Sequence, residues 1–338
     1  FFGRVRNLTE QALQSYLQSE DAQRTTQGTL VSEVTLAWLT LGANREQLAL
    51  QKETLASQEE SFRLVGESYK YGAASRLDYE QARTTVASAR AAITTYVRAV
   101  AQSQNALELL VGSKVPDELQ PSGVELAATL PATMPAGLPS EVLLNRPDII
   151  SAERGMISAN ANIGAARAAF FPSISLTANA GSASAHLSDL FGANTGLWSF
   201  TPSISIPIFT GGRNLANLRS AEVQEKIAVA TYEKSIQTAF QEVADALATE
   251  GTVERELKER REFADAASQA FELSSARYKH GAAAYTEVLD AQRTKVSAQQ
   301  AVITAELSRA SSLVTLYKVL GGGTELPDPA KTIEGAEK

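Results

Sequence analysis

Large apolar residues recur at every seventh position along four long stretches of the chain. The first two stretches carry Val34, Leu41, Leu48, Leu55, Phe62 and Tyr69, then Tyr79, Val86, Ile93, Val100 and Leu107. The other two carry Val243, Leu257, Ala264, Phe271 and Tyr278, interrupted at Glu250, then Leu289, Val296, Ile303, Ala310 and Tyr317. A period of 3.5 residues per turn predicts helices that supercoil on neighbours. The opposite faces are rich in Ala, Ser, Thr and Gln, so we expect each helix to pack on more than one side, as in the wall of a tube.

Two features of these stretches predict unusually long helices. Between Asn214 and Tyr278 the sequence contains no proline, and Gly251 is the only glycine. One helix of about 65 residues is therefore expected there, with a length of roughly 100 Å at 1.5 Å per residue. Gly72 and Gly281 stand between the paired stretches, where they are expected to reverse the chain.

The chain also contains an internal repeat. Residues 69–74 read Tyr-Lys-Tyr-Gly-Ala-Ala, and residues 278–283, which lie 209 positions further on, read Tyr-Lys-His-Gly-Ala-Ala. The same separation without gaps pairs Gly3-Arg4 with Gly212-Arg213, Glu33-Val34 with Glu242-Val243, and Gly112 with Gly321. These matches predict a duplication over roughly 110 residues.

Two shorter segments, 173–181 and 198–208, alternate between apolar and polar side chains. The apolar positions are Ile174, Leu176, Ala178 and Ala180 in the first, and Trp198, Phe200, Pro202, Ile204, Ile206 and Ile208 in the second. A period of two predicts strands. Such strands, joined by a Gly/Ser/Asn-rich loop and bordered by Phe171, Trp198 and Phe209, are typical of a transmembrane β-hairpin. A soluble hairpin packed on a helix is the alternative.

The number of strands bears on the oligomeric state. Even with a second hairpin from an upstream part of the first copy, one chain supplies about four strands, whereas a closed barrel needs at least eight. A transmembrane barrel therefore predicts an oligomer. The sequence has no run of about 18 apolar residues that would predict a membrane-spanning helix, so strands would make any contact with the membrane.

Composition narrows the chemistry that the chain can perform. Its 338 residues include no cysteine and only two histidines, His186 and His280. Thiol nucleophiles, metal clusters and histidine-led catalysis have almost no candidate residues, so we predict a protein that is not an enzyme and that binds no cofactor or metal. The net charge is -7, with acidic and basic residues mixed along the chain, which argues against a nucleic-acid partner.

Four motifs then suggest a family. They are Asn145-Arg146-Pro147-Asp148-Ile149, the run from Ala165 to Ile174 (AARAAFFPSI), the run from Pro207 to Arg213 (PIFTGGR), and Leu289-Asp290-Ala291-Gln292-Arg293. In this order and with the duplication, they resemble the TolC-like outer-membrane efflux proteins, closest to the OprM-type lipoprotein channels that serve resistance-nodulation-division (RND) pumps. The resemblance covers the chain to about Gly323.

The resemblance implies an architecture and a set of partners. The fold would be mainly α with a β-barrel part: long antiparallel coiled-coil helices form a trimeric α-barrel, and each chain contributes a hairpin to a shared twelve-stranded transmembrane β-barrel. The partners would be two further copies of the chain, outer membrane lipid, a periplasmic adaptor (membrane fusion) protein and an inner-membrane RND transporter. Such channels often carry a lipidated N-terminal cysteine.

On this basis we predict six parts. They are first-repeat long helices in 1–112, an equatorial linker in 113–145, a second-repeat helix in 146–170, the transmembrane β-hairpin in 171–209, second-repeat long helices in 210–321 and a C-terminal tail in 322–338. Because residues 146–209 precede the second copy, we expect the first copy to continue upstream of Phe1, where any signal peptide would also lie.

The two helix-reversal turns are the candidate docking site for the adaptor. The first turn contains Gly72, Ala73 and Ala74, and the second contains Gly281, Ala282 and Ala283. Small side chains would let another helical hairpin approach closely. The alternative is that these residues simply form tight turns that require glycine.

Asp290 is the candidate gate residue. It lies nine residues past the second turn glycine, hence within roughly 14 Å of the turn in a helix. Three-fold symmetry would gather three carboxylates into a ring that favours cations, with Glu287 in support. In the resembling family a matching aspartate narrows this end, and Arg277 and Tyr278 match residues that help hold the helices closed. The alternative is a surface pair of Asp290 with Arg293.

The predicted function is passive export of small molecules from the periplasm to the outside. The protein would be the outer-membrane exit duct of a tripartite drug efflux system and would extend into the periplasm. Two alternatives stay open, an exit duct for type I protein secretion and a structural coiled-coil protein. The second of these would be soluble without detergent and would not conduct in lipid bilayers.

Overall fold

The computed structural model describes residues 2–123, 143 and 145–322. The chain forms two compact units. The first unit consists of Phe1–Arg24 and Leu144–Thr238, and the second consists of Thr25–Leu143 and Ala239–Lys338. Most of the predicted equatorial linker and all but the first residue of the predicted tail lie outside the described residues, so the division into six parts stays a prediction.

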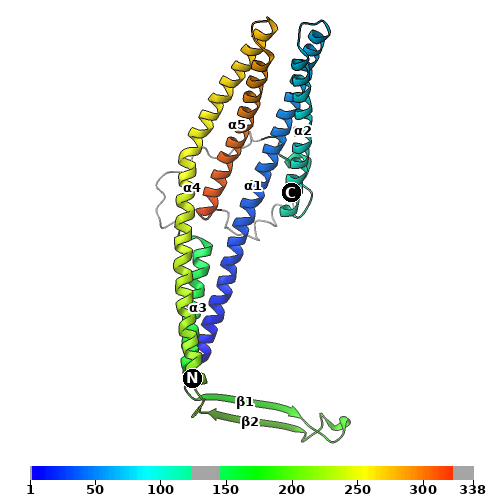
Figure 1. The fold of residues 1–338 in the computed structure, drawn as a ribbon. Helices are drawn as coiled ribbons and strands as arrows, with labels where there is room; N and C mark the ends of the chain where they lie inside the picture. The colour runs from blue at the N-terminus through cyan, green and yellow to red at the C-terminus, as the bar shows by residue number, and fades with distance from the viewer. Residues whose placement is uncertain (1, 124–142, 144, 323–338) are drawn as a thin grey trace, which may run out of the picture. The chain divides into compact units, whose positions relative to one another are not determined.

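Four long helices dominate the described part of the chain (Figure 1). They are α1 (Arg4–Lys70), α2 (Arg76–Val111), α4 (Arg213–Lys279) and α5 (Tyr285–Val319). The predicted long helix through Gly251 is confirmed, since α4 is continuous over 67 residues. Both bounds of α4 lie 209 residues beyond those of α1, as expected of a duplicated unit. None of the described helices is both long enough and apolar enough to cross a membrane.

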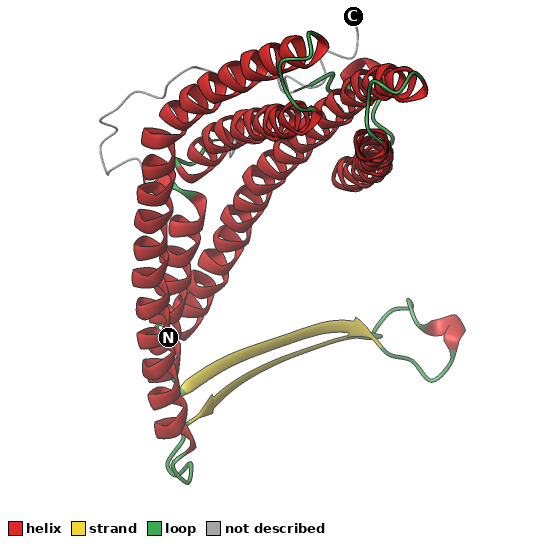
Figure 2. Cartoon of the chain, turned by 45° about the horizontal axis from the view of Figure 1, so that its top comes forward, coloured by secondary structure: helices red, strands yellow, loops and turns green. Residues whose placement is uncertain are grey.

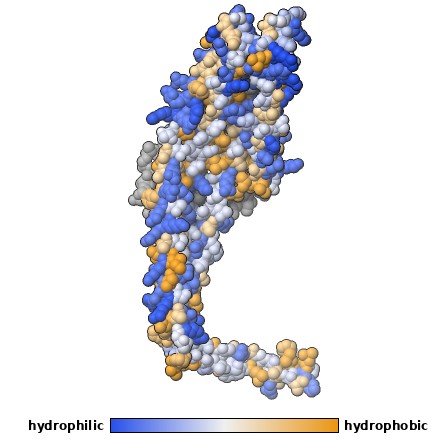
Figure 3. All heavy atoms as spheres, in the orientation of Figure 1, coloured by the Kyte–Doolittle hydropathy of each residue, from blue (hydrophilic) through white to orange (hydrophobic). Residues whose placement is uncertain are grey.

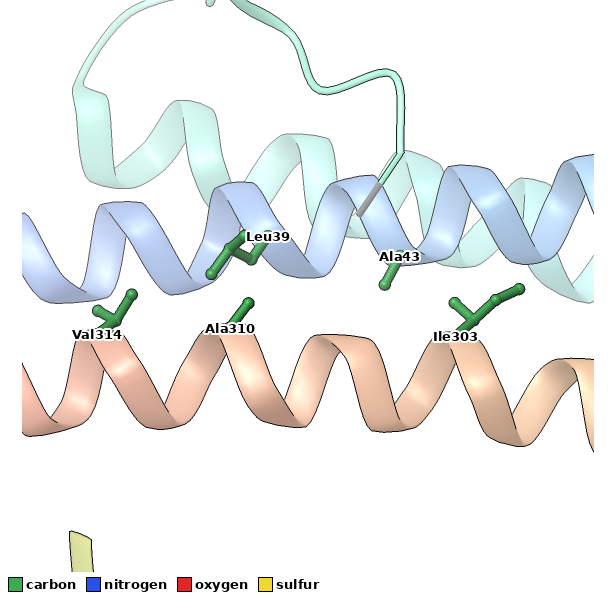
Figure 4. Close-up of a cluster of buried hydrophobic side chains, with 5 residues drawn as sticks. All are labelled: Leu39, Ala43, Ile303, Ala310 and Val314. Atoms are coloured by element: carbon green, nitrogen blue, oxygen red, sulfur yellow. The ribbon is translucent and has the colours of Figure 1, made fainter. Parts of the chain in front are cut away.

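In the second unit, α1 packs on α5 through small and branched apolar side chains. Leu39 and Ala43 of α1 point toward Ile303, Ala310 and Val314 of α5 (Figure 4). Ala43 and Ala310 have no side chain beyond Cβ, which lets the two backbones approach. Burial of Leu39, which is 2% exposed, stabilises the pair by roughly 1.5–3 kcal/mol.

The apolar heptad residues of α1 are not the most buried residues along the whole helix. Gln47, Gln51 and Thr54 are buried, whereas the heptad residues Leu48 and Leu55 are only half-buried. In this stretch the heptad positions therefore do not coincide with the buried face of the helix. A helix that packs on more than one side can bury polar positions, and the buried amide of Gln47 donates to the carbonyl of Gln300 at 3.1 Å.

In the first unit, helix α3 (Pro147–Ala168) packs against the start of α1. Pro147 is the first residue of the helix, and Asp148 in the first turn pairs with Arg146 at 2.7 Å, so this motif forms the start of α3. Close approach of the two helices depends on Gly164, because a Cβ there would lie 2.5 Å from the side chain of Asn7.

Two antiparallel strands, β1 (Ser173–Ser182) and β2 (Gly196–Ser205), form the predicted hairpin (Figure 2). The register pairs the apolar residues of one strand with those of the other: Ile174 with Ile204, Leu176 with Pro202, Ala178 with Phe200, and Ala180 with Trp198. A short 3-10 turn, η4 (Leu187–Asp189), lies in the connecting loop. The second strand was predicted at 198–208 but ends at Ser205; Pro207, which lacks a backbone N–H, lies just beyond that end.

Candidate functional site

Both helix hairpins of the second unit reverse through the same kind of turn. Gly72 has φ +74° and Gly281 has φ +71°, in the left-handed region. The amide of Gly72 donates to the carbonyl of Tyr69 at 3.1 Å, and that of Gly281 donates to the carbonyl of Tyr278 at 2.9 Å. A Cβ at either glycine would meet no atom within 4 Å. Glycine is therefore required here for backbone conformation and not for space.

The six predicted docking residues lie in and beside these turns. Gly72, Ala73, Gly281 and Ala282 are exposed, while Ala74 and Ala283 are half-buried. Ala74 packs against a buried apolar cluster at the base of the turns. These six residues thus contribute small, uncharged side chains to the turns, and their docking role stays a prediction.

The two helices that follow the turns begin differently. In the first copy, Ser75 and Asp78 form a reciprocal capping box, with backbone-to-side-chain distances of 3.1 Å in both directions. In the second copy, Ala284 stands in place of Ser75 and cannot cap the helix. Glu287, which matches Asp78 across the repeat, instead accepts from Arg277 at 3.3 Å. The capping box was missed at the sequence level although Ser-x-x-Asp indicates a helix start.

The charged gate candidates form two separate pairs. Arg277 bridges Glu287 and the carbonyl of Ala282 at 3.1 Å, so it ties the end of α4 to the second turn and to the start of α5. Asp290 lies 3.6 Å from Arg293, with side chains 78% and 71% exposed. The predicted alternative pair is thus present in the single chain, where it contributes less than about 1 kcal/mol.

Tyr278, the remaining gate candidate, lies against a buried apolar cluster. Its ring centroid is 5.2 Å from that of Tyr285, which packs with Val65 of α1, Ala82 of α2 and other α5 residues. Burial is the main cause that raises the pKa of Tyr285 to about 12, and the neighbouring Tyr278 and Asp78 add smaller contributions. Burial also raises the pKa of Tyr278, with Asp78 adding to the effect. Both hydroxyls are therefore neutral at physiological pH, and apolar contacts hold the bases of the two helix hairpins together.

Over the described ranges, no three His, Asp or Glu side chains are grouped so that they could hold a metal ion. Long helix pairs that end in small-residue turns, together with a hairpin that has one apolar face of the kind found in transmembrane barrels, indicate an outer-membrane channel protein.

Residues 1–113 and 138–322 match the family model of the outer membrane efflux proteins, and the chain belongs to this family. It is 50% identical over 322 residues to the solvent efflux pump outer membrane protein SrpC of Pseudomonas putida, a match that covers 95% of this chain and 68% of the relative. It is also 50% identical over 322 residues to the antibiotic efflux pump outer membrane protein ArpC of Pseudomonas putida, covering 95% and 66%.

A solved structure supports the same assignment. The open state of the Neisseria gonorrhoeae MtrE outer membrane channel superposes with a TM-score of 0.82 at 38% identity, covering 96% of this chain and 73% of that one. The predicted fold class, the location in the outer membrane with extension into the periplasm, and the role as an efflux outer-membrane component are therefore confirmed. The family is one of channels, which is not an enzyme class.

Proposed function

We propose that three copies of this protein form one passive exit duct for small molecules. The observation that carries the proposal is the hairpin of β1 and β2. Its apolar residues lie on one face and its hydroxyl-bearing residues on the other, as in a barrel wall, yet the described part of the chain has a sheet of only two strands. Two strands leave unpaired edges, which a hydrocarbon environment does not tolerate. Four strands per chain from three chains would close a barrel of twelve.

Native mass spectrometry of the full-length protein in detergent tests the trimer. We expect a complex of three chains. A monodisperse monomer that still conducts ions in planar bilayers would refute the proposal.

The second helix hairpin is the proposed gate. Three of its charged residues have uncharged counterparts 209 positions earlier: Arg277, Asp290 and Arg293 correspond to Ser68, Gln81 and Thr84. A trimer would contain six helix hairpins, of which three would carry these charges. In this proposal three Asp290 carboxylates ring the closed end of the tunnel, and the links from Arg277 to Glu287 and to the second turn hold each hairpin in the closed position.

Single-channel recording tests the ring. Asp290→Ala in the full-length trimer is expected to raise conductance and to weaken cation selectivity, measured as the reversal potential in a salt gradient, since electrostatic focusing strengthens a ring of like charges. Asp245→Ala, which removes an exposed carboxylate from α4, serves as the control and should change neither value. Unchanged conductance and selectivity in Asp290→Ala would eliminate the ring and leave the channel assignment intact.

The two turns are the proposed contact with a periplasmic adaptor. Their support is the exposed, uncharged surface of Ala73 and Ala282 beside glycines that expose backbone. Ala73→Glu or Ala283→Glu should abolish drug resistance in cells while leaving trimer abundance unchanged. Ala91→Glu, at an exposed position of α2, is the control for added charge. Retained resistance in both turn variants would exclude docking at this surface.

The proposed cargo is small apolar molecules, including organic solvents and antibiotics, delivered by an inner-membrane RND transporter. This proposal follows the relatives, two of which are named as solvent and antibiotic efflux pump components. It favours small-molecule efflux over protein secretion. Restoration of toluene tolerance in a strain that lacks its own channel tests it, and secretion of a protein substrate without such tolerance would contradict it.

A further inference from the structure

A basic surface surrounds the junction between the hairpin and the helices of the first unit. Its members are the exposed residues Arg4, Arg6, Arg167, Arg213 and Arg219, named here the arginine collar. Within the described ranges, none of their side chains forms an ion pair or a side-chain hydrogen bond. Glu10 is the only acidic residue in 2–12, 160–172 and 206–219. The collar is therefore locally cationic in a chain whose net charge is -7.

An exposed aromatic and aliphatic band lies directly beside the collar. The rings of Phe2 and Phe171 stack with centroids 4.9 Å apart, and both side chains are about half exposed. Ile208 and Phe209 are 94% and 90% exposed. Figure 3 shows apolar surface where the hairpin leaves the helices, with strongly hydrophilic surface next to it. Such a band is typical of the boundary between membrane hydrocarbon and water.

With the hairpin inserted, the collar would lie at the depth of lipid headgroups. Arg4 follows Phe2 by two residues, and Arg167 precedes Phe171 by four, which is about 6 Å along a helix. The headgroup layer on each side of a bilayer is roughly 5–8 Å thick, and a long arginine side chain can reach through it. Because the helices extend into the periplasm, this layer belongs to the inner leaflet of the outer membrane.

The internal repeat places two of these arginines at equivalent positions. Arg4 is the first residue of α1 and Arg213 the first of α4, and each follows a glycine with positive φ. A cationic side chain in the first turn is opposed by the helix dipole, so helix stability does not account for either arginine. Three protomers would present six such guanidinium groups around the barrel.

We propose that the arginine collar binds the headgroups of anionic phospholipids in the inner leaflet of the outer membrane. Guanidinium groups form bidentate, charge-assisted hydrogen bonds with phosphate oxygens. The neighbouring aromatic band contacts the upper acyl chains of the same lipids. The inference depends on insertion of the hairpin into the outer membrane but not on the gate, the adaptor or the cargo.

The experiment measures lipid selectivity of the full-length trimer in phosphatidylcholine bilayers at low salt. Spin-labelled phosphatidylglycerol and spin-labelled phosphatidylcholine are added in trace amounts, and the immobilised fractions give a relative association constant. We expect a preference for phosphatidylglycerol of about fivefold or more, the factor contributed by one arginine at a lipid surface. Arg4→Gln with Arg213→Gln should lower this preference while the other three collar arginines keep the ratio above one, whereas Arg4→Lys with Arg213→Lys should keep the preference unchanged.

Two controls separate the collar from bulk charge and from misfolding. Arg98→Gln with Arg255→Gln removes two exposed arginines of the second unit, outside the collar, and should leave the preference unchanged. Conductance in the same bilayers shows whether each variant has inserted into the membrane. If the collar double variant does not insert, Arg167→Gln alone is measured and should lower the preference.

Three results of the lipid measurement would overturn the proposal. They are no preference in the unaltered protein, an undiminished preference in the glutamine variants, and an equal loss in the control pair. Dissociation of the glutamine double variant into monomers would instead show that the arginines pair with carboxylates of a neighbouring copy, which also overturns lipid binding as their role.

Discussion

Gly42 is a position at which one methyl group should displace a segment of the chain. It lies in α1 of the second unit, where the segment after α2 crosses the helix. A Cβ at Gly42 would lie 2.8 Å from the carbonyl oxygen of Gly123 and 3.2 Å from Cβ of Pro121. The first distance is too short for any real contact, and the atom it meets belongs to backbone, so in Gly42→Ala the crossing segment has to move.

The magnitude follows from the contacts that hold this segment. Trp38 Nε1 donates to the carbonyl of Leu119 at 2.8 Å, and Arg45 Nη1 donates to the carbonyl of Pro121 at 2.9 Å. Loss of the neutral bond costs about 1 kcal/mol and loss of the charged bond about 2 kcal/mol. Alanine in place of a helical glycine stabilises α1 by about 1 kcal/mol, but it does so equally when the segment is docked and when it is open. The loss that affects the segment in Gly42→Ala is therefore about 3 kcal/mol, or about a 150-fold increase in opening of the segment.

Hydrogen exchange of the protein in detergent measures this opening directly. The amides of Leu119 and Gln120, which donate within the segment, should exchange about 150-fold faster in Gly42→Ala. Gly66→Ala is the matched control on the same helix, because its Cβ would meet Tyr79 at an ordinary 3.6 Å. It should stabilise α1 and leave the segment protected. Equal protection in Gly42→Ala and the unaltered protein would show that the close approach is relieved at no cost and would refute the reasoning.

Three further predictions concern the turns and their base. Ser75→Ala should lower the free energy of unfolding by about 1 kcal/mol in chemical denaturation, and Ala284→Ser, which completes a Ser-x-x-Glu box, should raise it by a similar amount; no change in either would contradict the capping account. Gly281→Ala should destabilise by about 1 kcal/mol because of its positive φ, whereas Gly251→Ala, with open space around it, should stabilise by about the same amount, both read from thermal unfolding. Stability should fall as pH rises from about 10 to about 12, because the unfolded tyrosine loses its proton first while the pKa of folded Tyr285 is about 12. In Tyr285→Phe the loss of unfolding free energy over this pH range should be smaller by about 1–2 kcal/mol. Identical pH profiles for the variant and the unaltered protein would contradict this role of Tyr285.

The long helices were predictable because their signals are local and repeated. The heptads from Tyr79 to Leu107 fall within α2, and the repeat fixes the start of α4 once that of α1 is known. The buried face of α1 near Gln51 was not predictable, because burial there depends on which neighbours cover the helix and not on the residue types along it. The end of β2 was also missed, although Pro207 gave a usable signal.

The positions of the candidate site residues along the helices were predictable from the sequence, but their contacts were not. The position of Asp290 relative to the second turn follows from helix geometry alone. The link between Arg277 and Glu287 joins residues on two helices across a turn, and its existence depends on how far that turn tilts one helix over the other. Glu287 was grouped with Asp290, whereas in the structure it pairs with Arg277.

The identical length of α1 and α4, 67 residues each, constrains how this chain can change in evolution. Removal of seven residues from one of them would shorten it by about 10 Å and preserve its heptad phase. Its antiparallel neighbour would then be too long, and the other copy would end at a different height. A viable change of length therefore requires matched deletions in all four helices. Channels of this design should vary in length in whole heptads and in both halves at once, while substitutions accumulate independently in each half.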